Sequence, residues 1–205
     1  MLTAVTEAST SDGGGVSGTV VIAPAGRGDA HYRANLAITS LDPATLTGDT
    51  ALAGAIDGRL DVDLHGTSRA SLAGHARASF DRFAIESAAL RSVRLESSWD
   101  TGEATIDLEV EGDDVSANLA GTMRPLDAVP RYDLRGPFRF RLAGDTMDLA
   151  VLAGRVMASG EGIGPASARA HVDFALSTVE IMAARLEAGH IVADLDTGRV
   201  VFSLD

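Results

Sequence analysis

The chain contains no cysteine, which excludes disulfides, thiolate metal sites and thiol catalysis. It also contains no lysine, so its 17 basic residues are all arginine, and against 29 acidic residues they leave a formal net charge of −12. Binding to nucleic acid or to an anionic bilayer depends on clustered basic side chains that neutralise phosphates. The charge balance argues against both, and we expect no nucleic-acid partner.

Aromatic residues are also scarce, with six Phe, two Tyr and one Trp, although 45% of the 205 residues are hydrophobic. That hydrophobic content is sufficient for a folded core, and the apolar surface it forms is mainly aliphatic. No apolar run reaches the length of about 18 residues that a spanning helix needs. The first residues, MLTAVTEASTSDGGG, lack the basic and apolar regions of a signal peptide, so the sequence predicts no targeting or spanning segment.

Apolar and polar residues alternate strictly in several segments. Residues 105–111 read TIDLEVE, and residues 59–65, 138–142 and 171–176 repeat the pattern. Strands of antiparallel sheets with one wet face show this period of two, whereas parallel strands buried on both faces do not. Glycine-containing turn signals separate the segments at short intervals, which predicts hairpins and a meander.

Helices are expected to be few. Residues 41–46 could form one short turn with Asp42 as N-cap and Pro43 at the first helical position. Residues 179–188 read VEIMAARLEA and have a pattern that is ambiguous between helix and strand. We interpret them as a strand, because they align with a strand segment elsewhere in the chain.

Two internal similarities indicate a repeat. The sequence LDPATLTG at residues 41–48 returns as MDLAVLAG at residues 147–154, and each copy follows a segment that begins with a tyrosine, Tyr32 and Tyr132. We interpret the shared motif as a turn, and self-similarity of this kind is typical of repeat architectures. The predicted organisation is a partial module with a first hairpin at 1–31, a module at 32–131 and a truncated second module at 132–205, which together form one segment of a longer repeat protein.

The second similarity has an offset of 96 residues and pairs Asp-Thr-Gly at 100–102 with Asp-Thr-Gly at 196–198. Paired Asp-Thr-Gly loops supply the two carboxylates of aspartic proteases. However, Glu103 and Arg199 follow where those enzymes resemble one another in a Ser or Ala, and few residues remain after the second triplet. We therefore predict that both triplets close equivalent hairpins.

Other candidate chemistry is weak. The histidines show no helical ligand spacing, so no metal site is predicted; they are His31, His65, His75, His171 and His190. The glycine-rich stretch at 160–164 lacks the Lys-Ser/Thr of a phosphate-binding loop. We expect no catalytic residue, no cofactor and no enzyme activity.

The tyrosine-led segments YRANL (32–36) and YDLRG (132–136), the Leu-Asp-x-Ala-x-Leu-x-Gly motif and the alternating strands together resemble the AsmA/TamB superfamily, and most closely the TamB-like proteins of the Gram-negative cell envelope. The resemblance implies an elongated, curved antiparallel β-sheet, a half-pipe or taco-like groove along which lipid acyl chains pass between the inner and outer membranes. It implies a location in the periplasm, with the membrane anchor outside this segment.

The predicted fold class is therefore all-β, an antiparallel sheet built from repeated modules, with a β-sandwich as the alternative. The expected function is a non-catalytic conduit that binds phospholipid or other acyl-chain lipids. The expected groove lining is Leu60, Val62, Leu64, Phe80, Ile85, Leu95, Ile106, Leu108, Val110, Phe138, Phe140, Phe174, Ile181, Ile191 and Phe202.

Period-two alternation alone also fits a structural β-sandwich or solenoid repeat of an envelope or surface protein, in which the same residues form a dry core. The expected partners of the conduit are neighbouring modules of a longer chain. Self-association is expected through open sheet edges near residues 16–22 and 200–204, where unpaired backbone groups are exposed.

Overall fold

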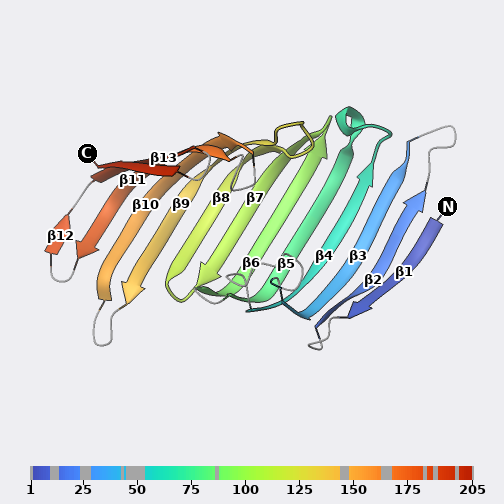
Figure 1. Ribbon diagram of the computed structural model, residues 1–205, viewed down its shortest axis with the longest axis horizontal. Helices are drawn as coiled ribbons and strands as arrows, with labels where there is room; N and C mark the ends of the chain where they lie inside the picture. The colour runs from blue at the N-terminus through green and yellow to red at the C-terminus, as the bar shows by residue number, and fades with distance from the viewer. Residues whose placement is uncertain are drawn as a thin grey trace. The chain divides into compact units, whose positions relative to one another are not determined.

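The computed structural model is all-β (Figure 1). It describes residues 2–9, 14–23, 29–42, 44, 54–85, 88–143, 148–162, 168–181, 184–186, 189–196 and 199–204. The strands are β1 (Leu2–Ser9), β2 (Gly15–Ala23), β3 (His31–Leu41), β4 (Gly54–His65), β5 (Ala73–Ile85), β6 (Ala88–Asp100), β7 (Glu103–Gly112), β8 (Val115–Arg124), β9 (Arg131–Ala143), β10 (Asp148–Glu161), β11 (Arg169–Ile181), β12 (Ala184–Leu186), β13 (Gly189–Asp196) and β14 (Arg199–Leu204). A three-residue 3-10 turn, Arg69–Ser71, precedes β5.

The strands belong to one sheet, and their hydrogen-bonded order follows the chain from β1 to β11 and then to β13 and β14, while β12 pairs with β11. All the registers determined between neighbouring strands are antiparallel. The sheet is open, because β1 and β14 are the two ends of the order. The predicted all-β antiparallel meander is confirmed, and the described strands include no second sheet that would make a sandwich.

The chain divides into two compact units. The first holds residues 1–102 and 109–113, which include β1 to β6, and the second holds residues 103–108 and 114–205, which include β8 to β14. The two units are described separately below.

Strand bounds recur with the offset of 96 residues found in the sequence. Strand β5 begins at Ala73 and ends at Ile85, and β11 begins at Arg169 and ends at Ile181. Strand β6 spans residues 88–100, and β12 and β13 together span 184–196 apart from residues 187 and 188. The repeat is therefore a repeat of strands.

A register shift also recurs at this offset. In the first unit the β4–β5 register shifts between Asp57 and Gly58, and in the second the β10–β11 register shifts between Ala153 and Gly154. A Cβ at Gly58 would lie 2.4 Å from the carbonyl oxygen of Ser79, and one at Gly154 would lie 2.1 Å from that of Ala175. Glycine inside a strand marks such close approaches of neighbouring backbones. The same backbone feature therefore occurs twice, with glycine where a side chain does not fit.

The first Asp-Thr-Gly triplet forms a two-residue turn between β6 and β7. Thr101 has a φ of 50° and Gly102 a φ of 79°, which are the positive values of a type I′ hairpin turn. Strand β13 ends at Asp196 and pairs this residue with Arg199 of β14, so two residues also separate these strands. Thr197 and Gly198 themselves lie outside the described residues.

The structure corrects two predictions. The second copy of the shared motif was expected to be a turn, but residues 148–154 form the first half of β10 and pair with both β9 and β11. Residues 149–153 are an unbroken apolar run without proline, and such a run favours a strand over a turn. Residues 16–22 were expected near an open edge, but β2 is an interior strand because β1 pairs with it.

Two other local predictions fall partly on described residues. Residues 179–181 and 184–186 are strands, as expected for that ambiguous segment. Asp42 accepts hydrogen bonds at its Oδ1 atom from the backbone N–H groups of Ala44 and Gly54, each at 3.0 Å. The first of these bonds is the N-cap contact that the sequence predicts; most of the expected helical turn lies outside the described residues.

Candidate functional site

One face of the first unit is apolar across its strands. The register places Leu60 opposite Leu36 of β3 and Ala78 of β5, and Ala78 in turn opposite Leu95 of β6. Parallel rows run through Val62 and Leu64, and Phe80 of β5 lies opposite Val93 of β6. Because side chains directly opposite each other share a face, the predicted lining residues of β4, β5 and β6 whose side chains are described lie on one surface.

The second unit has an equivalent apolar face. Phe140 lies opposite Leu152, and Val156 of β10 lies opposite Phe174, which lies opposite Ile191 of β13. The rings of Phe138 and Phe174 meet edge to face with centroids 5.4 Å apart. In other rows of the same face, Ile181 lies opposite Ala150 and Phe202 lies opposite Ala193.

Strand β7 carries the remaining predicted lining residues. Ile106 is only 9% exposed, Leu108 and Val110 are half-buried, and Asp107 between them is exposed. The strand therefore keeps the apolar and polar alternation that the sequence predicts. The side chain of Ile85 lies outside the described residues.

No described element covers the apolar face within either unit. Among the described residues, no large side chain falls below 2% exposure, and only nine hydrophobic residues are buried. Several apolar side chains are well exposed, with Phe140 at 42%, Ile181 at 49% and Phe202 at 70%. If another layer of the fold covered this apolar face, it would bury such residues.

Sequence reasoning missed the small members of this face. Ala76 and Ala78 of β5, and Gly154 and Ala158 of β10, lie in the same rows as the large apolar residues. They were missed because alanine and glycine do not stand out in a hydrophobic alternation. A signal was present, since each lies an even number of residues from a large apolar residue of its own strand.

The opposite face of the first unit is polar and carries ion pairs between neighbouring strands. Arg33 contacts Asp63 at 3.0 Å, and Arg77 contacts Glu96 at 3.6 Å. The Asn35 amide donates a hydrogen bond to Asp61 in the same way. All these pairs are exposed, and exposed pairs contribute about 0–1 kcal/mol each. They define which face is in water more than they stabilise the fold.

The polar face of the second unit has similar pairs. Arg169 contacts Asp196 at 3.2 Å and Glu161 at 3.5 Å. Arg124 donates to Glu103 at 2.8 Å, and this hydrogen bond, with the negative charge of Glu103, raises the pKa of the Arg124 guanidinium.

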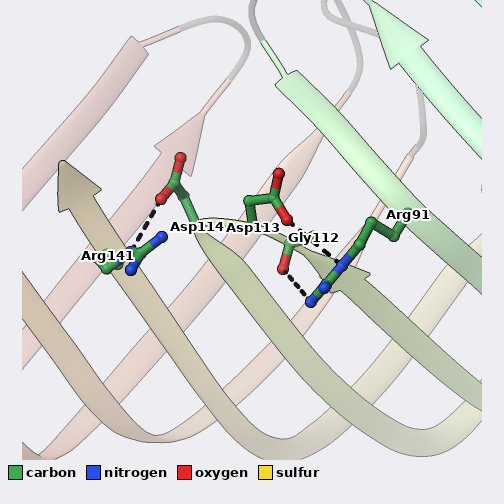
Figure 2. A network of polar contacts seen from close by, with 5 residues as sticks. All are labelled: Arg91, Gly112, Asp113, Asp114 and Arg141. Carbon is green, nitrogen blue, oxygen red and sulfur yellow. Dashed lines mark hydrogen bonds and ion pairs between the residues drawn. The ribbon is translucent and has the colours of Figure 1, made fainter.

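Adjacent acids at the β7–β8 turn contact two arginines (Figure 2). Arg91 donates to the carbonyl oxygen of Gly112 at 3.1 Å and contacts Asp113 at 3.5 Å. Asp114, the next residue, accepts a hydrogen bond from Arg141 Nε at 3.1 Å and also bonds the backbone of Arg141. The side chains are partly or largely exposed, so each of the two contacts is a solvated ion pair at a strand end.

Two hollows also lie on the polar face. One, of about 520 Å³, is lined by Arg131, Glu161, Arg169, His171 and Asp194 among others, and belongs to the second unit. The other, of about 310 Å³, belongs to the first unit and is lined by residues such as Arg33, Asn35, Asp63 and His75. Both are open and internally charge-paired, so neither resembles the apolar pocket of a small-molecule site.

The histidines lie on the polar face. His31 and His65 are opposite each other on β3 and β4, and their rings stack with centroids 5.9 Å apart. The sequence did not bring these two together, because they are 34 positions apart. His171 contacts Asp194 at 2.7 Å and His190 contacts Asp173 at 2.6 Å.

Within the described part of the chain, no group of three or more His, Cys, Asp or Glu could hold a metal ion. Asp196 of the second Asp-Thr-Gly triplet is engaged by Arg169, and Asp100 of the first is an exposed strand end.

Among the described residues, no helix is long and apolar enough to cross a membrane. Comparison with protein-family models, with curated protein sequences and with solved structures yields no match to this chain. The two faces of the sheet are therefore the features on which a function can be argued.

Proposed function

We propose that the apolar face binds the acyl chains of lipids and that the chain acts as a non-catalytic segment of a lipid-transport conduit. The observation that carries the proposal is that rows of apolar side chains continue from strand to strand within each unit while no described element covers them. A surface of this kind must be covered by something apolar, because contiguous exposed patches beyond a few hundred Å² are rare on soluble monomers.

Lipid tails fit this face for a physical reason. Transfer of apolar surface from water stabilises by roughly 25 cal/mol per Å², or about 0.8 kcal/mol per CH₂ group of an acyl chain. The binding needs no specific hydrogen bonds, so one chain type is accepted as well as another. The alanines and glycines between the larger residues, such as Ala78 and Gly154, leave space for a tail to lie along the sheet.

The polar face has the complementary property. Its ion pairs, such as Arg33 with Asp63 and Arg169 with Asp196, are exposed and need water. A sheet with one lipid-contacting face and one hydrated face can keep lipid tails out of water on its apolar side while it remains in an aqueous compartment. The TamB-like resemblance supports the periplasm as that compartment, with neighbouring modules of a longer chain extending the path between the two membranes.

Leu108→Asp tests the proposal with Asp107→Asn as the matched control. Leu108 is half-buried on the apolar side of β7, and Asp107 is exposed on the other side. An unpaired carboxylate in an apolar contact costs several kcal/mol, and each 1.4 kcal/mol is tenfold in affinity. Labelling of the purified chain by a photo-crosslinkable phospholipid, at subsaturating lipid, is expected to fall at least about tenfold in Leu108→Asp and to stay unchanged in Asp107→Asn.

Circular dichroism establishes that both variants keep the strand content of the wild type. If folded Leu108→Asp is labelled as strongly as the wild type, Leu108 does not contact lipid. If the wild type itself is not labelled, something other than lipid covers the apolar face. The chain is then a structural repeat module with a dry core and not a conduit.

A further inference from the structure

Three arginines gather at the centre of the polar face of the second unit. Arg135 and Arg139 are on β9, and Arg155 is on β10 opposite Pro137, the residue midway between them. Residues diagonal to each other on neighbouring strands have Cα atoms roughly 7–8 Å apart, so Arg135 and Arg139 each have Arg155 as a near neighbour on the same face. All three side chains are exposed.

The register leaves this trio without acids directly opposite. Arg135 faces Ala120 of β8 and Met157 of β10, and Arg139 faces Ser116 and Ala153. Arg155 faces Pro137 on one side and Ala175 on the other. None of the three side chains makes an ion pair or hydrogen bond with another residue of the described part of the chain.

Elsewhere on the polar faces the register places arginines directly opposite acidic residues. Arg33 lies directly opposite Asp63, Arg77 directly opposite Glu96 and Arg169 directly opposite Asp196, and each makes an ion pair there. Three acids lie nearby on the same face without pairing with the trio. Asp173, diagonal to Arg155, contacts His190, and Asp114, diagonal to Arg139, contacts Arg141. Asp133, two residues before Arg135 on β9, makes no ion pair with a described residue. In a chain with 29 acidic residues and 17 arginines, three clustered arginines without a carboxylate are an exception.

Two apolar residues lie next to the trio. Pro137 lies between Arg135 and Arg139, and Met157, which is 52% exposed, lies opposite Arg135. Neither hollow on the polar face includes any of the three arginines. Small ligands bind in concave sites, and an isolated anion on an exposed surface gains little because water screens the pair.

A protein partner changes this balance, because it covers the patch and excludes water from the ion pairs. Arginine and methionine are also the residues enriched at protein interfaces. We propose that the surface formed by Arg135, Pro137, Arg139, Arg155 and Met157 is a docking site for an acidic, extended protein segment. An anionic bilayer is broad enough to approach the acidic residues around the patch as well, whereas a narrow segment contacts the patch alone, so the net charge of −12 disfavours a membrane more than a peptide.

The spacing of the arginines along β9 predicts the residue pattern of the docked segment. Arg135 and Arg139 are four residues apart on β9, or about 13 Å at roughly 3.3 Å per residue. An extended segment lying along β9 meets them with carboxylates at positions i and i+4. Its residue at i+2 lies over Pro137 and beside Met157, where an aliphatic side chain fits.

A peptide of repeating Glu-Ser-Leu-Ser has this pattern and is the probe. We would measure its binding to the full chain by fluorescence anisotropy at about 0.02 M and about 0.15 M salt. Salt weakens exposed ion pairs more than ion pairs that the bound peptide covers, so the comparison distinguishes the two. The variant Arg135→Gln/Arg139→Gln/Arg155→Gln is compared with Arg33→Gln/Arg77→Gln/Arg94→Gln. The second variant removes the same net charge from arginines that already have ion partners.

The expected result is that the first variant binds the peptide at least about tenfold more weakly than the wild type, while the second stays within about twofold of it. A Gln-Ser-Leu-Ser peptide is expected not to bind. Equal weakening by both variants, or binding of the Gln peptide, would overturn the proposal. So would a dependence on the trio seen with vesicles of phosphatidylcholine and phosphatidylglycerol but not with the acidic peptide, since a membrane would then be the occupant.

Discussion

Replacing Gly102 by Val is expected to destabilise the chain, because two independent costs meet at this position. Gly102 has a φ of 79°, where a residue with a Cβ costs about 1–2 kcal/mol more than glycine. A Cβ there would also lie 2.5 Å from the carbonyl oxygen of Arg69, so the backbone must shift, and this shift strains the bond from Gly102 N to the Leu72 carbonyl at 3.1 Å. Together these give a loss of about 2–4 kcal/mol.

The preceding residue supplies a control with the opposite sign. Thr101 is β-branched and has a φ of 50°, so the native turn already carries strain. Asparagine tolerates this region and is the preferred first residue of such turns. Thr101→Asn is therefore expected to stabilise by roughly 0.5–1 kcal/mol.

Thermal unfolding followed by circular dichroism measures both changes. For a chain of this length each kcal/mol shifts the melting temperature by roughly 2–4 °C, so a lowering of several degrees is expected for Gly102→Val and a small rise for Thr101→Asn. An unchanged midpoint in Gly102→Val would refute the turn geometry. A destabilised Thr101→Asn would show that the threonine side chain has a role that the backbone argument omits.

Two further predictions follow from the repeat and from the open sheet. Gly58→Val and Gly154→Val are expected to lower the free energy of unfolding by similar amounts, about 1–3 kcal/mol, because each Cβ would press on a neighbouring carbonyl. The control Ala153→Val, beside Gly154, stays within about 0.5 kcal/mol of the wild type. Unequal losses in urea unfolding would argue against equivalent sites. The purified chain at low micromolar concentration is expected to carry lipid or to self-associate through β1, β14 or the apolar face. Native mass spectrometry and light scattering test this, and a lipid-free, stable monomer would contradict it.

The strand content and the two faces of the strands were predictable from local sequence. In residues 105–111 and 59–65 the apolar residues recur every second position, and a strand turns successive side chains to opposite faces. The Asp-Thr-Gly turn at 100–102 was predictable for the same kind of reason, because glycine at a positive φ is a requirement of the turn itself. Each of these inferences needs only residues close together in the chain.

The shared motif shows where local reasoning fails. LDPATLTG and MDLAVLAG look alike, yet residues 148–154 are interior strand with partners on both sides. Pro43 is present in the first copy and absent from the second, and proline disfavours an interior strand because it lacks a backbone donor. The similarity of the other residues therefore did not indicate the strand that residues 148–154 form.

The sequence by itself determined that this protein is an antiparallel β chain with an apolar and a polar side, because side-chain alternation and turn chemistry act over a few residues. Only the tertiary structure decided which residues meet across the strands. It set His31 against His65, Arg33 against Asp63, and Arg155 against Pro137. The physical reason is that a change of register by two residues keeps every side chain on its face. Alternation therefore leaves the cross-strand partners open, and the positions of bulges and turns select among them.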